Sequence, residues 1–137
     1  MSEENVEIIR RGYALFAAGD YQAVTALLSD DVEVTDSGGL GVTGSAAGYR
    51  QGHEGFLRST EEALEAFEDF RVEPEDFIDA GDVVVVPVRL SGKGRGSGVE
   101  MEMRLAHLWV LGSDGKVVRS EIYETTAEAL EAAGLRE

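Results

Sequence analysis

Hydrophobic positions follow a helical period in the first half of the chain and a strand period in most of the second. Apolar residues recur every three or four positions over residues 4–18, which predicts an amphipathic helix there. Gly19 ends this helix, and Asp20 caps a short second helix. A third helix is predicted over residues 54–68. Each helix therefore has one apolar side to bury.

Apolar and polar residues alternate through most of the remaining sequence, and this is the period of a β-strand. The alternation predicts a strand over residues 32–36 that ends at Asp36, and further strands after the third helix. On the last strand, Val118, Ser120 and Ile122 are expected to share the inner face. The later extended segments are residues 70–79, 83–91, 99–111 and 116–124.

The order of these elements predicts an α+β fold in a single domain, residues 1–137. Three N-terminal helices are expected to pack on one face of a strongly curved antiparallel sheet. A short C-terminal helix is predicted over residues 126–133, ended by Gly134. A bent sheet under helices encloses either a solid core or a cavity, and the sequence leaves both open.

The strand over residues 99–111 carries the main functional question. Its odd-numbered residues are apolar except for His107, which shares their face, whereas Glu100 and Glu102 point the other way. A lone titratable ring among aliphatic side chains is either a core histidine with satisfied hydrogen bonds or a working group in a pocket. These two interpretations separate a structural protein from an enzyme.

Charge and composition narrow the choice of partner. The chain has 12 basic and 27 acidic residues, for a formal net charge of −15 at pH 7. Because phosphate groups are bound by clustered lysine and arginine, neither nucleic acid nor a membrane surface is predicted as a partner. No apolar run approaches the roughly 20 residues that span a bilayer. With a polar N-terminus, the sequence predicts a cytoplasmic protein.

Metal and cofactor sites are not predicted. Cysteine is absent, and the two histidines lie far apart in the sequence. His53, just before the third helix, is more typical of a solvated helix start than of a functional group. Gly39–Gly44 fits G-x-G-x-x-G, but no βαβ unit surrounds it, so the match is interpreted as accidental. The glycine-rich residues 37–52 are expected to form a mobile loop, with a role as a pocket lid left open.

Four segments spread over the chain show a family resemblance. The chain resembles the nuclear-transport-factor-2-like superfamily, which includes ketosteroid isomerases, and in particular its SnoaL-like branch. The matching segments are Tyr13–Asp20 (YALFAAGD), Leu28–Glu33 (LSDDVE), Gly52–Gly55 (GHEG) and Asp114–Tyr123 (DGKVVRSEIY). The resemblance implies a cone-shaped α+β barrel, often dimeric, with a pocket between the helices and the concave face of the sheet. Members include isomerases, polyketide cyclases, dehydratases and proteins without catalytic activity, so the fold does not settle the function.

The resemblance to ketosteroid isomerases implies two catalytic residues. Asp36 falls at the position of their general base, and His107 at the position of the protonated carboxylic acid in their oxyanion hole. The position of their oxyanion tyrosine matches Gly12, with Tyr13 one step along the helix, which puts a steroid substrate in question. On sequence alone, Asp36 can equally cap the turn that follows it. His107 can equally be a core histidine bonded to Tyr13 or to a backbone carbonyl.

Two functions follow from these alternatives. In the first, the protein is a cofactor-independent acid–base enzyme of the isomerase, cyclase or dehydratase type, acting on an apolar metabolite with a carbonyl group. In the second, it is a non-catalytic ligand-binding protein or dimeric scaffold. The enzyme and the binding protein use a small apolar organic ligand, whereas a scaffold has a filled core. A homodimer through the outer sheet face is expected. The ligand-binding residues are predicted to be Tyr13, Val88, Met103, Leu105, Trp109 and Ile122.

Overall fold

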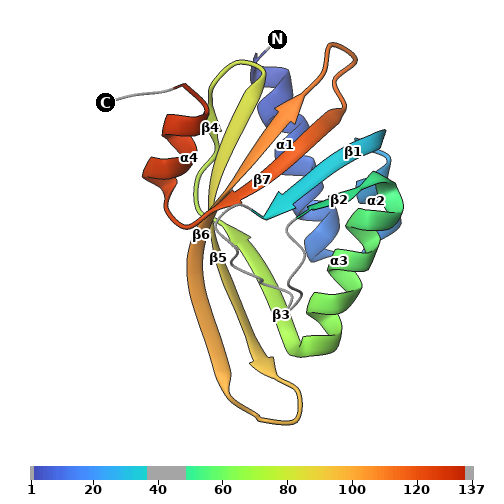
Figure 1. The fold of residues 1–137 in the computed structure, drawn as a ribbon, viewed down its shortest axis with the longest axis vertical. Helices are drawn as coiled ribbons and strands as arrows, with labels where there is room; N and C mark the ends of the chain where they lie inside the picture. Colours follow the sequence, from blue (N-terminus) through green and yellow to red (C-terminus); the bar gives the residue numbers. More distant parts are fainter. Residues whose placement is uncertain (1, 37–48, 135–137) are drawn as a thin grey trace.

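A curved sheet with helices on its concave side forms the body of the molecule (Figure 1). The computed structural model describes residues 2–36 and 49–134. The predicted lid lies largely outside these ranges, because residues 37–48 are not described. The elements are α1 (Ser2–Ala17), α2 (Tyr21–Thr25), β1 (Leu28–Asp36), β2 (Tyr49–Gln51), α3 (Gly52–Ala66), β3 (Phe67–Pro74), β4 (Ile78–Asp79), β5 (Val83–Gly94), β6 (Glu100–Leu111), β7 (Val117–Tyr123) and α4 (Thr126–Ala132).

The predicted helix boundaries hold to within two residues, and local chemistry explains them. Gly19 adopts a positive φ of 81° after α1, a conformation that glycine reaches without strain. The Asp20 carboxylate accepts a hydrogen bond of 3.2 Å from the backbone N–H of Ala23, which caps α2 as predicted. At the other end of the chain, Gly134 has a φ of 87° and follows α4.

The sheet is mixed, whereas the sequence predicted antiparallel strands throughout. Its strands lie in the order β2-β1-β7-β6-β5-β3, with β4 paired to β5. The pairing of β1 with β7 is parallel, and the other pairings are antiparallel. A hairpin connection makes neighbouring strands antiparallel, but β1 and β7 lie far apart in sequence and are free of that constraint. The sheet curls into a half-barrel.

The inner face of the sheet carries the side chains that the alternation predicted. Val86 on β5 lies opposite His107 on β6, and Val84 lies opposite Trp109. The pairing of β6 with β7 has a register shift between Val110 and Leu111 of β6. This shift buries Val117 at the inner face and leaves Val118 37% exposed, so the predicted inward position of Val118 is wrong. Ser120 and Ile122 share the inner face as expected, because they lie opposite Trp109 and His107.

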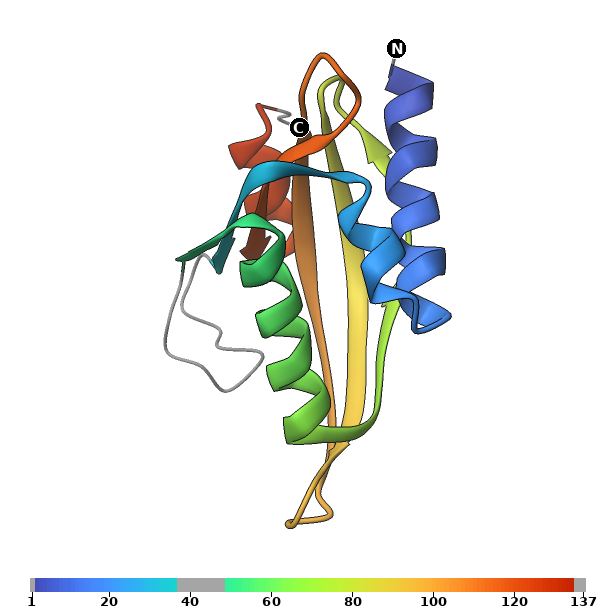
Figure 2. The same ribbon diagram turned by 90° about the vertical axis from the view of Figure 1, so that its right-hand side faces the viewer.

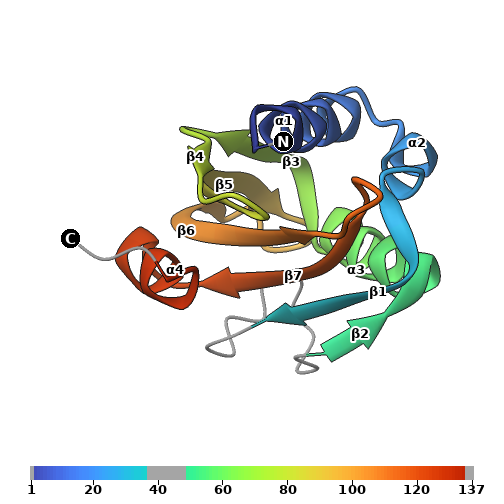
Figure 3. The same ribbon diagram turned by 90° about the horizontal axis from the view of Figure 1, so that it is seen from above.

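Helices lie on both faces of the sheet. Views from the side and from above show α1 and α3 on the concave side and α4 on the other side (Figures 2 and 3). The larger core lies on the concave side and includes Ile9, Leu28, Val32, Val84, Val86, Val88, Leu90, Leu105, Leu111 and Val117. The smaller core joins Ala129 of α4 to Val85, Ala106 and Leu108 on the outer face.

The outer sheet face is thus apolar at one end and charged elsewhere. Away from α4, Arg89 contacts both Glu73 and Glu102, and Arg104 lies 3.3 Å from Glu75. Such exposed ion pairs contribute little to stability. The homodimer predicted through this face stays a prediction.

Candidate functional site

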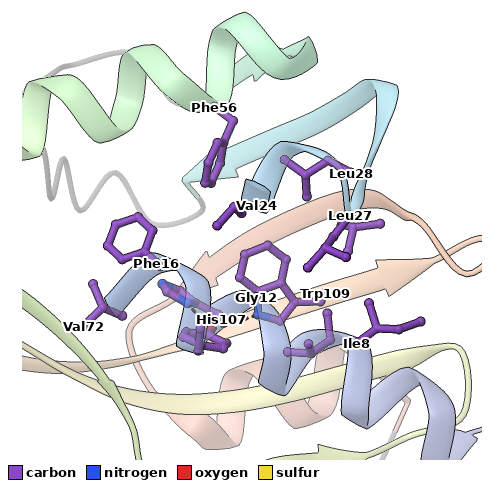
Figure 4. A pocket seen from close by; sticks show the side chains of 13 residues that line it. Ile8, Gly12, Phe16, Val24, Leu27, Leu28, Phe56, Val72, His107 and Trp109 are labelled. Carbon is purple, nitrogen blue, oxygen red and sulfur yellow. Dashed lines mark hydrogen bonds between the residues drawn. The ribbon is translucent and has the colours of Figure 1, made fainter. Parts of the chain in front are cut away.

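A hollow of about 120 Å³ lies between α1, α2 and the inner face of the sheet (Figure 4). Its wall is almost entirely apolar, and His107 and Trp109 enter it from β6. The alternation of β6 places these two rings on one face, two residues apart. The lining residues are Ile8, Ile9, Gly12, Tyr13, Phe16, Val24, Leu27, Leu28, Phe56, Val72, His107, Trp109 and Val117.

Three ring side chains in this wall form a hydrogen-bonded chain. The indole N–H of Trp109 donates to the hydroxyl oxygen of Tyr13 over 2.9 Å. The same hydroxyl lies 2.6 Å from Nδ1 of His107. The rings of Tyr13 and His107 are nearly parallel, with an interplanar angle of 15°, and Trp109 meets both edge-on. Helix α1 therefore supplies the middle member of a chain whose two ends lie on β6.

The direction of these bonds assigns the hydrogen on His107. An indole nitrogen only donates, so the Tyr13 oxygen accepts from Trp109 and its own O–H remains to be used. The acceptor within reach is Nδ1 of His107, which must then carry no hydrogen. A neutral imidazole with a bare Nδ1 has its hydrogen on Nε2. No residue in the described ranges is a hydrogen-bond partner of Nε2.

Burial keeps this chain neutral. Desolvation lowers the pKa of His107 from 6.5 to about 4, because an imidazolium is poorly stabilised between helix and sheet. Burial also raises the pKa of the Tyr13 hydroxyl far above its usual value, with the Trp109 hydrogen bond acting in the opposite direction. Both side chains are therefore uncharged at neutral pH. The site offers hydrogen bonds rather than charge.

A second hollow of about 140 Å³ adjoins the first. The two share five lining side chains: Phe16, Phe56, Val72, His107 and Trp109. The second hollow is more polar than the first, because Glu121 lines it and so do three hydroxyl residues. These are Ser59 and Thr60 from α3 and Ser120 from β7.

The predicted ligand-binding residues fall into two groups. Tyr13 lines the first hollow, Ile122 lines the second, and Trp109 lines both. Val88 and Leu105 are instead fully packed in the core, with 0% and 3% exposure. Alternation alone does not distinguish a position under the hollow from one sealed by neighbouring side chains.

Met103 lies away from both hollows and is 36% exposed. It sits on the long β5–β6 hairpin, whose tip projects beyond the end of α3 (Figure 2). The inner face of β6 is therefore covered at His107 but partly exposed at Met103 near the tip. The alternation of the sequence is the same at both places.

Asp36 is placed by its backbone alone, since its side chain lies outside the described part of the chain. Its backbone is in register with Ile122 on β7, and Ile122 is in register with His107 on β6. The three residues thus form one row across neighbouring strands. Two strand spacings correspond to roughly 10 Å between the Cα atoms of Asp36 and His107.

His53 makes a structural hydrogen bond and lines neither hollow. Its Nε2 lies 2.9 Å from the backbone carbonyl of Leu28, and since a carbonyl only accepts, the imidazole donates. This bond ties the start of α3 to the start of β1. Among the described residues, no group of three or more histidine, aspartate or glutamate side chains lies close enough together to hold a metal ion.

Several wall residues were not singled out in the sequence as binding residues. Phe56 and Val72 come from α3 and β3, and the sequence pattern identified them only as apolar. A signal for Ser120 did exist, because it is a polar residue at an inward position of a strand.

Comparison with known proteins agrees with this architecture. An NTF2-like protein of Burkholderia thailandensis has a TM-score of 0.79 and 26% identity, with 96% of this chain and 98% of that chain covered. An NTF2-like protein of unknown function from Burkholderia pseudomallei has a TM-score of 0.77 and 25% identity, covering 93% and 95%. TerC, crystallised with polyporic acid, has a TM-score of 0.76 and 27% identity, covering 96% and 98%. The fold is therefore the NTF2-like fold.

The sequence identifies the family more closely. Residues 9–120 match the family described as the SnoaL-like domain. The chain belongs to this family, as the four quoted segments indicated. No curated protein sequence matches the chain. No helix in the described ranges is both long and apolar enough to cross a membrane.

Proposed function

We propose that the protein binds a small, mainly apolar organic molecule carrying a carbonyl oxygen, and that His107 donates a hydrogen bond to that oxygen. The observation that carries this proposal is the chain from Trp109 through Tyr13 to His107 in the wall of an apolar hollow. Ligand sites are typically apolar and contain a few well-placed polar groups. TerC, a relative with 27% identity, was crystallised with an organic acid.

The unpartnered nitrogen favours a binding role over a purely structural one. A core histidine that only supports packing is expected to have both nitrogen atoms hydrogen-bonded. In His107 only Nδ1 has a partner in the described part of the chain, and the ring lines both hollows. A donor left unpaired in this way is available to a ligand oxygen. This donor gives a preference for ligands with an acceptor over ligands with ammonium or other groups that only donate.

Ring-sized probe molecules test this proposal. An apolar cavity of about 150 Å³ accommodates benzene. The first hollow, at about 120 Å³, is smaller, but it adjoins the second hollow of about 140 Å³, and the two together offer room for a substituted benzene ring. We expect acetophenone to bind more tightly than ethylbenzene, which has a similar shape but no carbonyl. His107→Phe should weaken acetophenone binding about tenfold, the value of one hydrogen bond of about 1.4 kcal/mol, and leave ethylbenzene binding unchanged. Isothermal titration calorimetry measures both.

A matched control uses the other histidine. His53→Phe removes an imidazole that lies outside both hollows, so it should keep the preference for acetophenone. Equal binding of acetophenone and ethylbenzene by the wild-type protein would contradict the role of His107.

A second candidate function is proton transfer, and the strand register favours it. Asp36 and His107 lie in one row of the sheet, two strands apart. In this reaction the Asp36 carboxylate removes a proton from the carbon next to the carbonyl, and the C–H electron pair moves to form an enolate. Neutral His107 then stabilises the enolate oxygen through its N–H.

Hydrogen exchange of a bound ketone tests this reaction without knowledge of the natural substrate. In D₂O, the protein should accelerate deuterium incorporation into the methyl group of acetophenone, followed by NMR. Asp36→Asn should reduce this exchange at least 100-fold while acetophenone still binds, because an amide is not a base at neutral pH. If the wild-type protein does not accelerate this exchange beyond the rate in buffer, proton transfer is ruled out and the protein binds ligands without catalysis.

A further inference from the structure

Ser120 is a buried side chain with an unused hydroxyl group. The residue is 8% exposed and lies on the inner face of β7, between Val34 of β1 and Trp109 of β6. Within residues 2–36 and 49–134, its hydroxyl has no hydrogen-bond partner. Burying a hydroxyl without a partner destabilises the folded state, so such a group in a folded protein requires an explanation.

The position of Ser120 explains why its hydroxyl is left without a partner. It lines the second hollow, whose wall also contains the hydroxyl residues Ser59 and Thr60. The Thr60 hydroxyl donates to the backbone carbonyl of Phe56 over 3.1 Å, which leaves its oxygen free to accept. The first hollow is almost entirely apolar. Side by side, the two hollows form one site with an apolar end and a hydroxyl-lined end.

His107 and Ser120 are close enough to hold one molecule. His107 lies directly opposite Ile122, and Ser120 precedes Ile122 by two residues on the same face. Such diagonal neighbours on adjacent antiparallel strands have Cβ atoms about 7 Å apart. Substituents at opposite ends of a benzene ring are separated by a comparable distance. The imidazole N–H only donates, whereas the serine hydroxyl both donates and accepts.

We propose that Ser120 is a second anchor, which selects ligands with a hydroxyl or second oxygen across the ring from the carbonyl group. This inference rests on the proposed binding of a carbonyl compound beside His107. It extends that proposal to a substrate class, which comprises hydroxylated cyclic ketones and related oxygenated rings. The ligand oxygen replaces the missing partner of the Ser120 hydroxyl. Phe16 and Phe56, which line both hollows, contact the ring between the two anchors.

A comparison of two probes tests this anchor. In calorimetry with the wild-type protein, 4-hydroxyacetophenone should bind about fivefold more tightly than acetophenone, the effect of one net hydrogen bond. Ser120→Ala should abolish this advantage and change acetophenone affinity less than twofold. Ser91→Ala is the matched control, because Ser91 lies on β5 opposite Glu102, on the outer face of the same sheet. It should keep the fivefold advantage.

Stability provides a second measurement on the same variant. Because alanine removes an unpaired hydroxyl, Ser120→Ala should unfold at the same or a higher urea concentration than the wild type. A loss of stability above about twofold in the unfolding equilibrium would mean that the hydroxyl already has a partner, such as a buried water, and would overturn the inference.

The outcomes separate the two proposals. If acetophenone binds in a His107-dependent manner but the added hydroxyl gives no Ser120-dependent gain, the second anchor is wrong and the carbonyl site stands. If acetophenone binding does not depend on His107, both proposals fail.

Discussion

The two nitrogen atoms of His107 have different surroundings, and this difference is the basis of the proposed site. Nδ1 accepts from Tyr13, which in turn accepts from Trp109. Nε2 has no partner among the described residues and is left for a ligand. One hydroxyl group on α1 therefore sets both the orientation of the imidazole and the position of its hydrogen. Such a support is needed for a hydrogen bond to act at a defined point.

The pH dependence of His107 follows from its burial. Its pKa in the folded protein is lowered to about 4, below the value of 6.5 in the unfolded chain. Between these values the unfolded chain binds a proton that the folded protein does not. The free energy of unfolding should therefore fall as pH decreases from about 6.5 to 4, by up to about 3 kcal/mol from this residue. His107→Phe should lack this part of the dependence.

NMR of the imidazole signals checks this directly. The folded protein should show a His107 titration midpoint near pH 4. A midpoint near 6.5 would mean that water reaches the ring freely, and the neutral donor proposed here would then be protonated in part at physiological pH.

At the scale of elements, α4 has the clearest effect on the sheet. It buries Ala129 completely against the outer face, where it covers Val85 and Leu108. Removing each such aliphatic side chain from water stabilises the fold by about 1.5–3 kcal/mol. The helix has only seven residues, so its own hydrogen bonds do not maintain it in isolation. Its N-cap and this packing hold it in place.

Removing the N-cap residue tests whether the cap helps to hold α4 on the sheet. The Thr125 hydroxyl accepts from the backbone N–H of Glu128 over 3.1 Å. Thr125→Ala should lower the free energy of unfolding by about 1 kcal/mol, measured by urea titration. Thr126→Ala is the control, because the neighbouring threonine is inside the helix and makes no cap; its effect should stay within about 0.5 kcal/mol. Equal effects of the two changes would show that the cap does not hold α4.

For the whole molecule, charge is the dominant feature. The chain has 27 acidic and 12 basic side chains, so acidic side chains outnumber basic ones by more than two to one. The exposed ion pairs on the outer sheet face, such as Arg104 with Glu75, add little stability individually. Mutual repulsion among the remaining carboxylates favours the expanded chain.

Salt should therefore stabilise this protein. Raising NaCl from 10 to 500 mM shortens the screening length from about 30 Å to a few ångströms, which suppresses long-range repulsion more than close ion pairs. We expect the Tm to rise by several degrees, measured by circular dichroism, which corresponds to about 1 kcal/mol for a domain of this size. A Tm that falls with salt would mean that the ion pairs outweigh the repulsion.

Most of the elements, their inner faces and the family were determined by the sequence. Strand β2 was not, because it lies within residues 37–52, which the sequence predicted to form a loop. Periodicity is a local property, so the helices and strands and the inward positions of His107, Trp109 and Ser120 could be predicted from neighbouring residues alone. The same reasoning misplaced Val118, because a register shift depends on the partner strand. It also could not separate Leu105, sealed in the core, from Trp109 at the wall, since both are apolar and inward.

Only the tertiary structure decided which inward residues meet. The parallel pairing of β1 with β7, the hydrogen-bonded chain through Tyr13 and the unpartnered hydroxyl of Ser120 all depend on segments far apart in the sequence. The hollows exist because helices and a curved sheet do not fill the space between them, and that outcome depends on the packing of all the elements together. The sequence named the chemical groups, and long-range packing determined which of them a ligand could reach.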